Sequence, residues 1–122
     1  MKYLTFAFLI LLPLFGHSQK RTLLGPKVAM DELKEALTNK KDKQVNVDKV
    51  ISDKQTAIAV AEAILFKIYG KEQIINERPY EVYFVNDYWI LNGTLPEKML
   101  GGCFLIVLSA KDGKVVRLTH YK

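Results

Sequence analysis

The spacing of apolar side chains predicts one long helix in the middle of the chain. From Ser52 to Lys71 the apolar residues recur every three or four positions. Ser52 or Asp53 can cap the first turn through a side-chain oxygen, and Gly70 can end the helix in the left-handed conformation that glycine tolerates. The residues expected on the core-facing side are Ala57, Val60, Ala61, Ile64, Leu65, Ile68 and Tyr69.

A weaker helical pattern precedes this helix. Residues from Val28 to Leu37 place apolar side chains between charges, which favours a short amphipathic helix. The segment 39–48 that follows is polar and contributes three lysines to a chain whose net charge is +5. It contains no aromatic residue, so it lacks the pattern of a nucleic-acid-binding stripe. We interpret it as a solvated loop.

After Pro79 the apolar pattern changes to a period of two, which is typical of strands. Asn86-Asp87 and Asp112-Gly113 each favour a hairpin turn. Helices followed by strands predict an α+β fold, with a curved antiparallel sheet of at least four strands packed on N-terminal helices. The four expected strands are 80–85, 88–94, 103–110 and 115–121.

The two hairpins define the faces of the sheet, because residues directly opposite each other share a side. With these turns, Phe84 lies opposite Trp89 and Val107 lies opposite Leu118. The expected core side contains Tyr80, Val82, Phe84, Trp89 and Leu91 of the first hairpin, and Cys103, Leu105, Val107, Val116 and Leu118 of the second. The outer side mixes tyrosine, arginine and apolar residues, as protein-binding surfaces do. An ordinary solvated sheet face is the alternative.

The N-terminus has the features of a signal peptide. Lys2 precedes an apolar run that ends at Phe15, and the small residue Ser18 follows. The run is shorter than the ~20 residues of a membrane span, so we expect cleavage after Ser18, with a retained anchor as the alternative. The mature protein is then exported to the periplasm or cell envelope and is not membrane-bound. The expected divisions are a signal peptide (1–18), an N-terminal segment with a weak helix and a Lys-rich loop (19–49), and a globular domain (50–122).

Few residues are suited to metal binding or catalysis. After the signal peptide the chain has one histidine, His120, and one cysteine, Cys103, which are too few for a metal cluster. We expect no metal, no other cofactor, an inert thiol, and a histidine that is solvated or hydrogen-bonded at a sheet edge. Glu62 lies on the flank of the long helix and is expected to be solvated. Gly101-Gly102 precedes a strand and not the helix N-terminus that a phosphate loop needs, so we interpret it as a turn.

Several short motifs occur together in an order and spacing that resemble a known family. The motifs are Tyr69-Gly70-Lys71, Pro79-Tyr80, Trp89 with Gly93 to Pro96, Gly101-Gly102 and Asp112-Gly113-Lys114. They resemble the bacterial immunity proteins of polymorphic toxin systems, which have a nuclear-transport-factor-2-like (cystatin-like) fold, and the resemblance covers residues 50–122. It implies a curved sheet wrapped on helices and non-catalytic neutralisation of a cognate protein toxin.

The resemblance and the predicted faces lead to a hypothesis about the binding site. We predict that the toxin binds the outer side of the sheet at Glu81, Tyr83, Tyr88, Arg117 and Tyr121. An envelope small-molecule-binding protein or an enzyme on the same fold is the alternative, since a fold does not fix a function. An enzyme needs an acid or base in a pocket, and on the expected core side only His120, at its end, is of that kind.

Overall fold

The computed structural model describes residues 16, 19–39 and 47–122 of the chain. The chain divides into two units, residues 1–43 and 44–122. The predicted signal peptide lies outside the described residues apart from Gly16, and so does most of the lysine-rich loop. None of the helices in the described ranges is long and apolar enough to cross a membrane.

The described part of the first unit contains the helix α1 (Pro26–Thr38). Proline stands in its first turn, where the missing N–H costs no helical hydrogen bond. The helix confirms the one predicted over Val28–Leu37 and extends slightly beyond it at both ends. No residue of α1 is buried, so its apolar side chains are exposed to solvent.

The second unit contains the long helix α2 (Lys54–Tyr69) and the short helix α3 (Lys71–Ile75). The Asp53 carboxylate accepts a hydrogen bond of 2.8 Å from the Thr56 N–H, which caps α2 and lowers the pKa of Asp53. Gly70, with a φ of +92°, ends α2 as predicted. The sequence pattern does not predict α3, because so short a segment cannot show a helical period.

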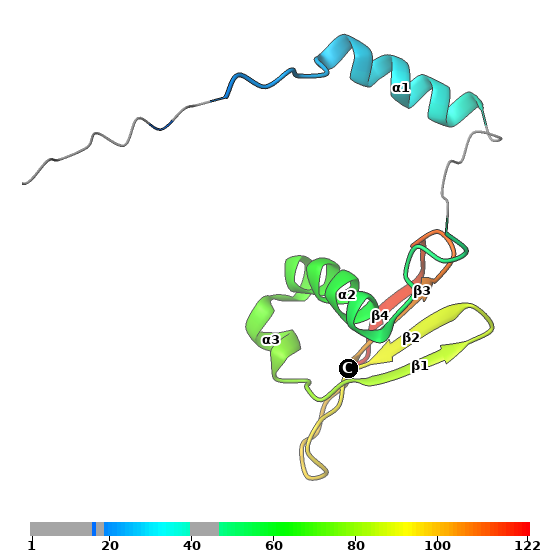
Figure 1. Cartoon of the computed structure of the whole chain (residues 1–122). Helices are drawn as coiled ribbons and strands as arrows, with labels where there is room; N and C mark the ends of the chain where they lie inside the picture. Colours follow the sequence, from blue (N-terminus) through cyan, green and yellow to red (C-terminus); the bar gives the residue numbers. More distant parts are fainter. Residues whose placement is uncertain (1–15, 17–18, 40–46) are drawn as a thin grey trace, which may run out of the picture. The chain divides into compact units, whose positions relative to one another are not determined.

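Four antiparallel strands complete the second unit. They are β1 (Glu81–Val85), β2 (Tyr88–Asn92), β3 (Phe104–Ser109) and β4 (Val115–His120). Each strand pairs with the next along the chain, so the spatial order is β1-β2-β3-β4. Figure 1 shows α2 lying over this sheet and the loop between β2 and β3 extending away from it. The predicted α+β fold, with helices before an antiparallel sheet, is confirmed.

The first hairpin has the predicted register. Asn86 and Asp87 have φ angles of 49° and 66°, as a type I′ turn requires. Phe84 pairs with Trp89, and their ring centroids are 4.8 Å apart. The Trp89 side chain is 8% exposed, and its Nε1 donates a hydrogen bond of 2.9 Å to the Ile51 carbonyl. Trp89 is therefore a core residue, as predicted, whereas Phe84 remains 46% exposed because it lies on the edge strand.

The register predicted for the second hairpin is wrong by one residue. Leu118 pairs with Ile106 and not with Val107, and a register shift follows between Val107 and Leu108. A one-residue slip moves a strand's side chains to the other face of the sheet. Leu105 and Val107, predicted to be core residues, therefore lie on the outer face. Every position of β3 up to Leu108 is apolar. Without alternation of apolar and polar residues, the sequence does not indicate which face of β3 is buried.

The core lies between α2 and the inner face of the sheet. Its α2 residues lie four positions apart, and Ile68, expected beside them, is 53% exposed. Val116, expected in the core, is 54% exposed as well. The buried apolar residues are Ile51, Ala57, Ala61, Leu65, Ile74, Trp89, Leu91, Phe104, Ile106, Leu108 and Ala110.

The Gly101-Gly102 step closes the loop between β2 and β3. Gly101 has a φ of +142°, a conformation that other residues rarely adopt. A Cβ atom at Gly102 would overlap the backbone carbonyl of Tyr121. The glycines thus let the chain turn and pass close to the end of β4. Strand β3 follows directly, which confirms the interpretation as a turn.

Candidate protein-binding surface

The pairing of the strands brings the predicted binding residues to one face. Tyr83 of β1, Ile90 of β2, Val107 of β3 and Arg117 of β4 are successive partners across the sheet. Partners in a row share a side, and Trp89, which neighbours Ile90 in β2, points to the opposite, core side. We call the side of Tyr83 and Arg117 the outer face.

The other three predicted residues lie beside this row. Glu81 belongs to the next row and Tyr88 to the row at the hairpin end. Tyr121 follows β4, and its N–H donates a hydrogen bond to the Cys103 carbonyl. Its hydroxyl accepts a bond of 3.4 Å from Arg117 Nη2. In the row of Glu81, the partners on the other strands are Asn92, Leu105 and Thr119. In the row of Tyr88, they are Val85 and Ser109.

The exposure of the outer face varies from its centre to its rim. Tyr83, Tyr88 and Tyr121 are 55%, 41% and 46% exposed, while Ile90 and Val107 at the centre are partly buried. The result is an aliphatic strip bordered by tyrosines, an arginine and a glutamate. Aromatic and arginine side chains around an apolar centre are typical of protein-binding patches.

The predicted binding residues share a face even though one register was wrong. The slip changes which residues of β3 accompany β4, but all five predicted residues lie outside β3. Phe104, Ile106 and Leu108, expected on the outer side, are buried instead. Leu105 and Val107 take their place, so the centre of the outer face stays aliphatic.

A second polar cluster, around Glu77, lies at one end of the inner face. Glu77 is 1% exposed. Its Oε2 accepts a hydrogen bond of 2.8 Å from the Phe104 N–H, and its Oε1 lies 2.6 Å from His120 Nε2 and 3.5 Å from Gln73 Nε2. A Cβ atom at Gly93 would overlap this carboxylate. Glu77 therefore joins the α3–β1 connection to β3 and to the end of β4.

His120 is held on both sides of its ring. Its Nε2 contacts Glu77, and its Nδ1 lies 2.9 Å from the Tyr121 carbonyl, which can only accept a hydrogen bond. Nδ1 is therefore the donor in that contact. The Tyr69 ring packs 5.1 Å from the imidazole. With both nitrogens engaged, the imidazole offers no free nitrogen to a substrate.

Cys103 is partly buried beside this cluster. Burial raises the pKa of the Cys103 thiol, and the charge of Glu77 adds to the effect. Both causes disfavour the thiolate, which is the reactive form of cysteine. The expectation of an inert thiol agrees with this environment. Within the described ranges, no group of three or more His, Cys, Asp or Glu side chains could hold a metal ion.

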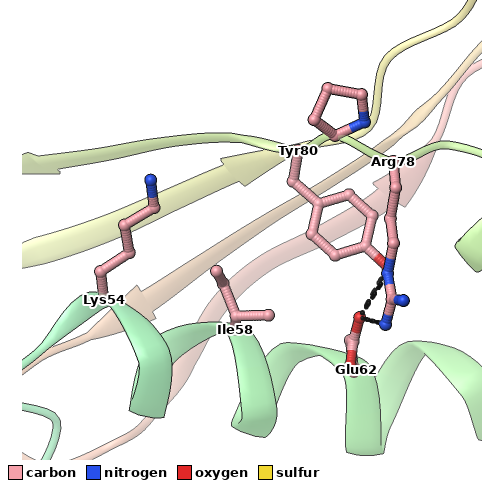
Figure 2. Close-up of a pocket in the computed structure, with 6 residues that line it drawn as sticks. Lys54, Ile58, Glu62, Arg78 and Tyr80 are labelled. Atoms are coloured by element: carbon pink, nitrogen blue, oxygen red, sulfur yellow. Dashed lines mark hydrogen bonds and ion pairs between the residues drawn. The ribbon is translucent and has the colours of Figure 1, made fainter.

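A groove of about 560 Å³ runs between α2 and the segment that enters β1. Figure 2 shows Lys54, Ile58 and Glu62 along one side of α2, with Arg78 and Tyr80 facing them. Glu62 Oε1 accepts hydrogen bonds from Arg78 Nε at 3.1 Å and from the Tyr80 hydroxyl at 2.9 Å.

Two pKa values in the groove are raised, for different reasons. The hydrogen bond to Glu62 raises the pKa of Arg78, and burial raises the pKa of Tyr80. The expectation of a solvated Glu62 is wrong, because its side chain is 17% exposed and bonds both neighbours.

Sequence reasoning missed Glu77 altogether. Its strongest partners, Phe104 and His120, lie 27 and 43 positions away in the chain. No local pattern links residues so far apart, so composition and spacing gave no signal for this cluster. For Glu62, the Arg78-Pro79-Tyr80 sequence ahead of the first strand offers nearby donors, but only the packing of α2 on the sheet brings them together.

Comparison with known proteins identifies the family. Residues 56–122 match the NTF2 fold immunity proteins. The match covers more than half of the chain, from the first turn of α2 to the last residue, and includes all four strands. The chain therefore belongs to the NTF2 fold immunity protein family.

Two uncharacterized proteins of Escherichia coli (strain K12) are similar to this chain. YhhH is 29% identical over 77 residues, which cover 62% of this chain and 61% of YhhH. YbbC is 31% identical over 78 residues, which cover 63% of this chain and 64% of YbbC. The chain thus matches less than two thirds of the length of either relative. No solved structure matches it.

Proposed function

We propose that this protein neutralises a cognate protein toxin by binding it, without catalysis, through the outer face of the sheet. The observation that carries the proposal is the exposed group of Glu81, Tyr83, Tyr88, Arg117 and Tyr121 around an aliphatic centre. Membership of an immunity protein family supports the same function. The signal-peptide features of residues 1–18 favour an encounter in the periplasm or cell envelope.

The chemistry of the outer face suits tight protein binding. Tyrosine and arginine dominate interface energies, and truncating a central one costs ~2 kcal/mol or more of binding free energy. Tyr83 and Arg117 border the partly buried Ile90 and Val107, so a bound toxin would exclude water from both. Glu81 lies at the rim and would act mainly on orientation and association rate.

The Glu77 cluster supports a non-catalytic role. Both carboxylate oxygens of Glu77 and both ring nitrogens of His120 are occupied by partners within the protein. A general acid or base must exchange a proton with a substrate within hydrogen-bond reach. For these two residues, such contact would require breaking the bonds that join the sheet to the α3–β1 connection.

One observation favours small-molecule binding as a second candidate function. A cavity of about 380 Å³ lies against Glu77, within the size range of ligand pockets. Its other lining residues are Gln73, Asn76, Leu95, Pro96 and Met99. If this cavity binds a small molecule, Met99→Trp should abolish that binding by filling the cavity, and changes on the outer face should leave it unchanged.

The test of the proposed function is a double substitution on the outer face. Tyr83→Ala with Arg117→Glu removes an aromatic contact and reverses a charge. The control, Ile68→Ala with Lys67→Glu, makes comparable changes on the exposed side of α2. Both variants are first shown to fold by circular dichroism and urea denaturation.

Each variant is then produced together with the proposed toxin. We expect the outer-face variant to lose growth protection and at least about 100-fold in affinity, while the control keeps both. Unchanged protection and affinity in the outer-face variant would refute binding through this face.

A further inference from the structure

The strand β1 has a free edge within the described part of the chain. It is the first strand of the sheet and pairs only with β2. Four of its five residues are exposed. Edge strands usually carry devices that prevent pairing with another chain, because their unpaired backbone groups can bind a further strand.

The hairpin geometry determines which backbone groups face this edge. Val85 and Tyr88 flank a two-residue turn, and such a flanking pair exchanges both of its hydrogen bonds. The positions of β1 bonded to β2 are then Val85, Tyr83 and Glu81. The N–H and C=O groups of Val82 and Phe84 consequently point to the free edge.

The two edges of the sheet differ in regularity. Pairing of β4 with β3 contains a register shift between Val107 and Leu108, and irregularities of this kind disrupt the pairing of an edge. Pairing of β1 with β2 is continuous from Glu81 to Val85. The β1 edge is therefore the better template for an added strand.

The groove beside this edge offers unused positive charge. Arg78 uses Nε and one terminal nitrogen on Glu62, and its side chain is 49% exposed. A guanidinium has five N–H donors, so several remain for a ligand. Lys54 is exposed and has no ion-pair partner among the described residues. Ile58 and Tyr80 provide an apolar floor between the two cations.

We propose that the β1 edge and this groove bind an extended acidic segment of the partner protein. The segment adds as a fifth strand on Val82 and Phe84, and its acidic side chains on the inner side face Lys54 and Arg78. Main-chain hydrogen bonds would supply affinity and the alternate side chains specificity, as in other cases of strand addition. The inference rests on the proposed function for the identity of the partner as a toxin.

Synthetic peptides test the site without a toxin. The probe is a peptide of about seven residues, the length of a typical strand, in which glutamate alternates with threonine and valine. One control replaces glutamate by lysine, and another carries N-methyl groups on alternate amides. We expect the acidic peptide to shift the NMR signals of the Val82 and Phe84 amides and to slow their hydrogen exchange.

The control peptides test separately the contribution of charge and that of main-chain hydrogen bonds. The lysine peptide should bind at least about tenfold more weakly, and N-methylation on the pairing side should abolish binding, because it removes the hydrogen bonds. Absence of binding by the acidic peptide up to about 1 mM, or binding that leaves both edge amides unprotected, would overturn the proposal.

Substitutions in the protein provide a second test. Val82→Pro removes an edge N–H that the sheet does not use, and Val82→Thr keeps it. Lys54→Gln removes a groove charge, and Lys67→Gln removes a charge from α2 outside the groove. We expect about tenfold weaker peptide binding for Val82→Pro and Lys54→Gln, and no more than about twofold for the two controls. Equal binding by Val82→Pro and Val82→Thr would contradict strand addition.

The same variants distinguish this inference from the proposed function. A toxin complex that Tyr83→Ala with Arg117→Glu disrupts, but Val82→Pro leaves intact, would overturn strand addition and support the immunity function. A protein that binds the acidic peptide at the edge but no toxin would overturn the immunity function and the toxin as the source of the segment.

Discussion

Trp89 and Tyr83 lie on neighbouring strands but on opposite faces of the sheet. The indole of Trp89 is buried and donates its N–H to the Ile51 carbonyl. Tyr83 is 55% exposed, and its hydroxyl has no hydrogen-bond partner among the described residues. The same contrast holds more widely, because every buried side-chain nitrogen and oxygen in the described ranges has a partner, whereas the outer face keeps donors and acceptors open to solvent.

We propose that this difference reflects separate roles for the two faces. A packed face whose polar groups are all hydrogen-bonded stabilises the fold. Each group removed from it leaves a cavity or a hydrogen-bonding group without its partner. An exposed face whose polar groups are only partly hydrogen-bonded within the protein adds little to stability, and it can bind a partner protein. Substitutions on the inner face should therefore change the free energy of unfolding, and substitutions on the outer face should change binding alone.

The largest effect is expected for Trp89→Ala. It removes a large buried aromatic side chain that packs on Phe84 and bonds Ile51. The loss should lower the free energy of unfolding by about 3–5 kcal/mol, measured by urea denaturation. Trp89→Phe is the control and should lose less, because it keeps an aromatic ring. A Trp89→Ala protein as stable as the parent would show that this side chain is not part of the core.

A somewhat smaller effect is expected for Glu77→Ala. The substitution leaves the buried Phe104 N–H without an acceptor and takes away the partner of His120. The free energy of unfolding should fall by about 2–3 kcal/mol, mostly from the unpaired N–H. Glu72→Ala removes an exposed carboxylate from α3 and should have almost no effect. If toxin binding by the folded Glu77→Ala protein also fell sharply, the division between the two faces would fail.

The sequence predicts the parts of the fold that local chemistry determines. The cap at Asp53, the end of α2 at Gly70 and the Asn86-Asp87 turn all follow from residues within a few positions of each other. The register of β3 with β4 does not, because its strand is apolar on both sides and the packing against α2 selects the buried face.

The same reasoning explains which parts of the site were predicted. Tyr83, Tyr88 and Arg117 share a face as predicted, because the error in the second register moves only the side chains of β3 to the other face. Glu77 and the Glu62–Arg78 pair depend on contacts between distant segments. A carboxylate in a polar connection has the same local pattern whether it is solvated or buried, so these two groups were found only in the structure.

The smallest effect on stability, and the sharpest test of the comparison, is expected for Tyr83→Ala. The side chain is more than half exposed, lies on the edge strand and makes no hydrogen bond within the described residues. Its removal should change the free energy of unfolding by no more than about 0.5 kcal/mol. The same variant should lose ~2 kcal/mol of binding free energy toward the toxin, close to a thirtyfold weaker Kd, because a bound partner desolvates the ring. Isothermal titration and urea denaturation on one preparation measure both quantities. Val116→Ala on β4, which is 54% exposed, is the matched control and should leave both nearly unchanged. A Tyr83→Ala protein that loses stability but not affinity would reverse the roles assigned to the two faces.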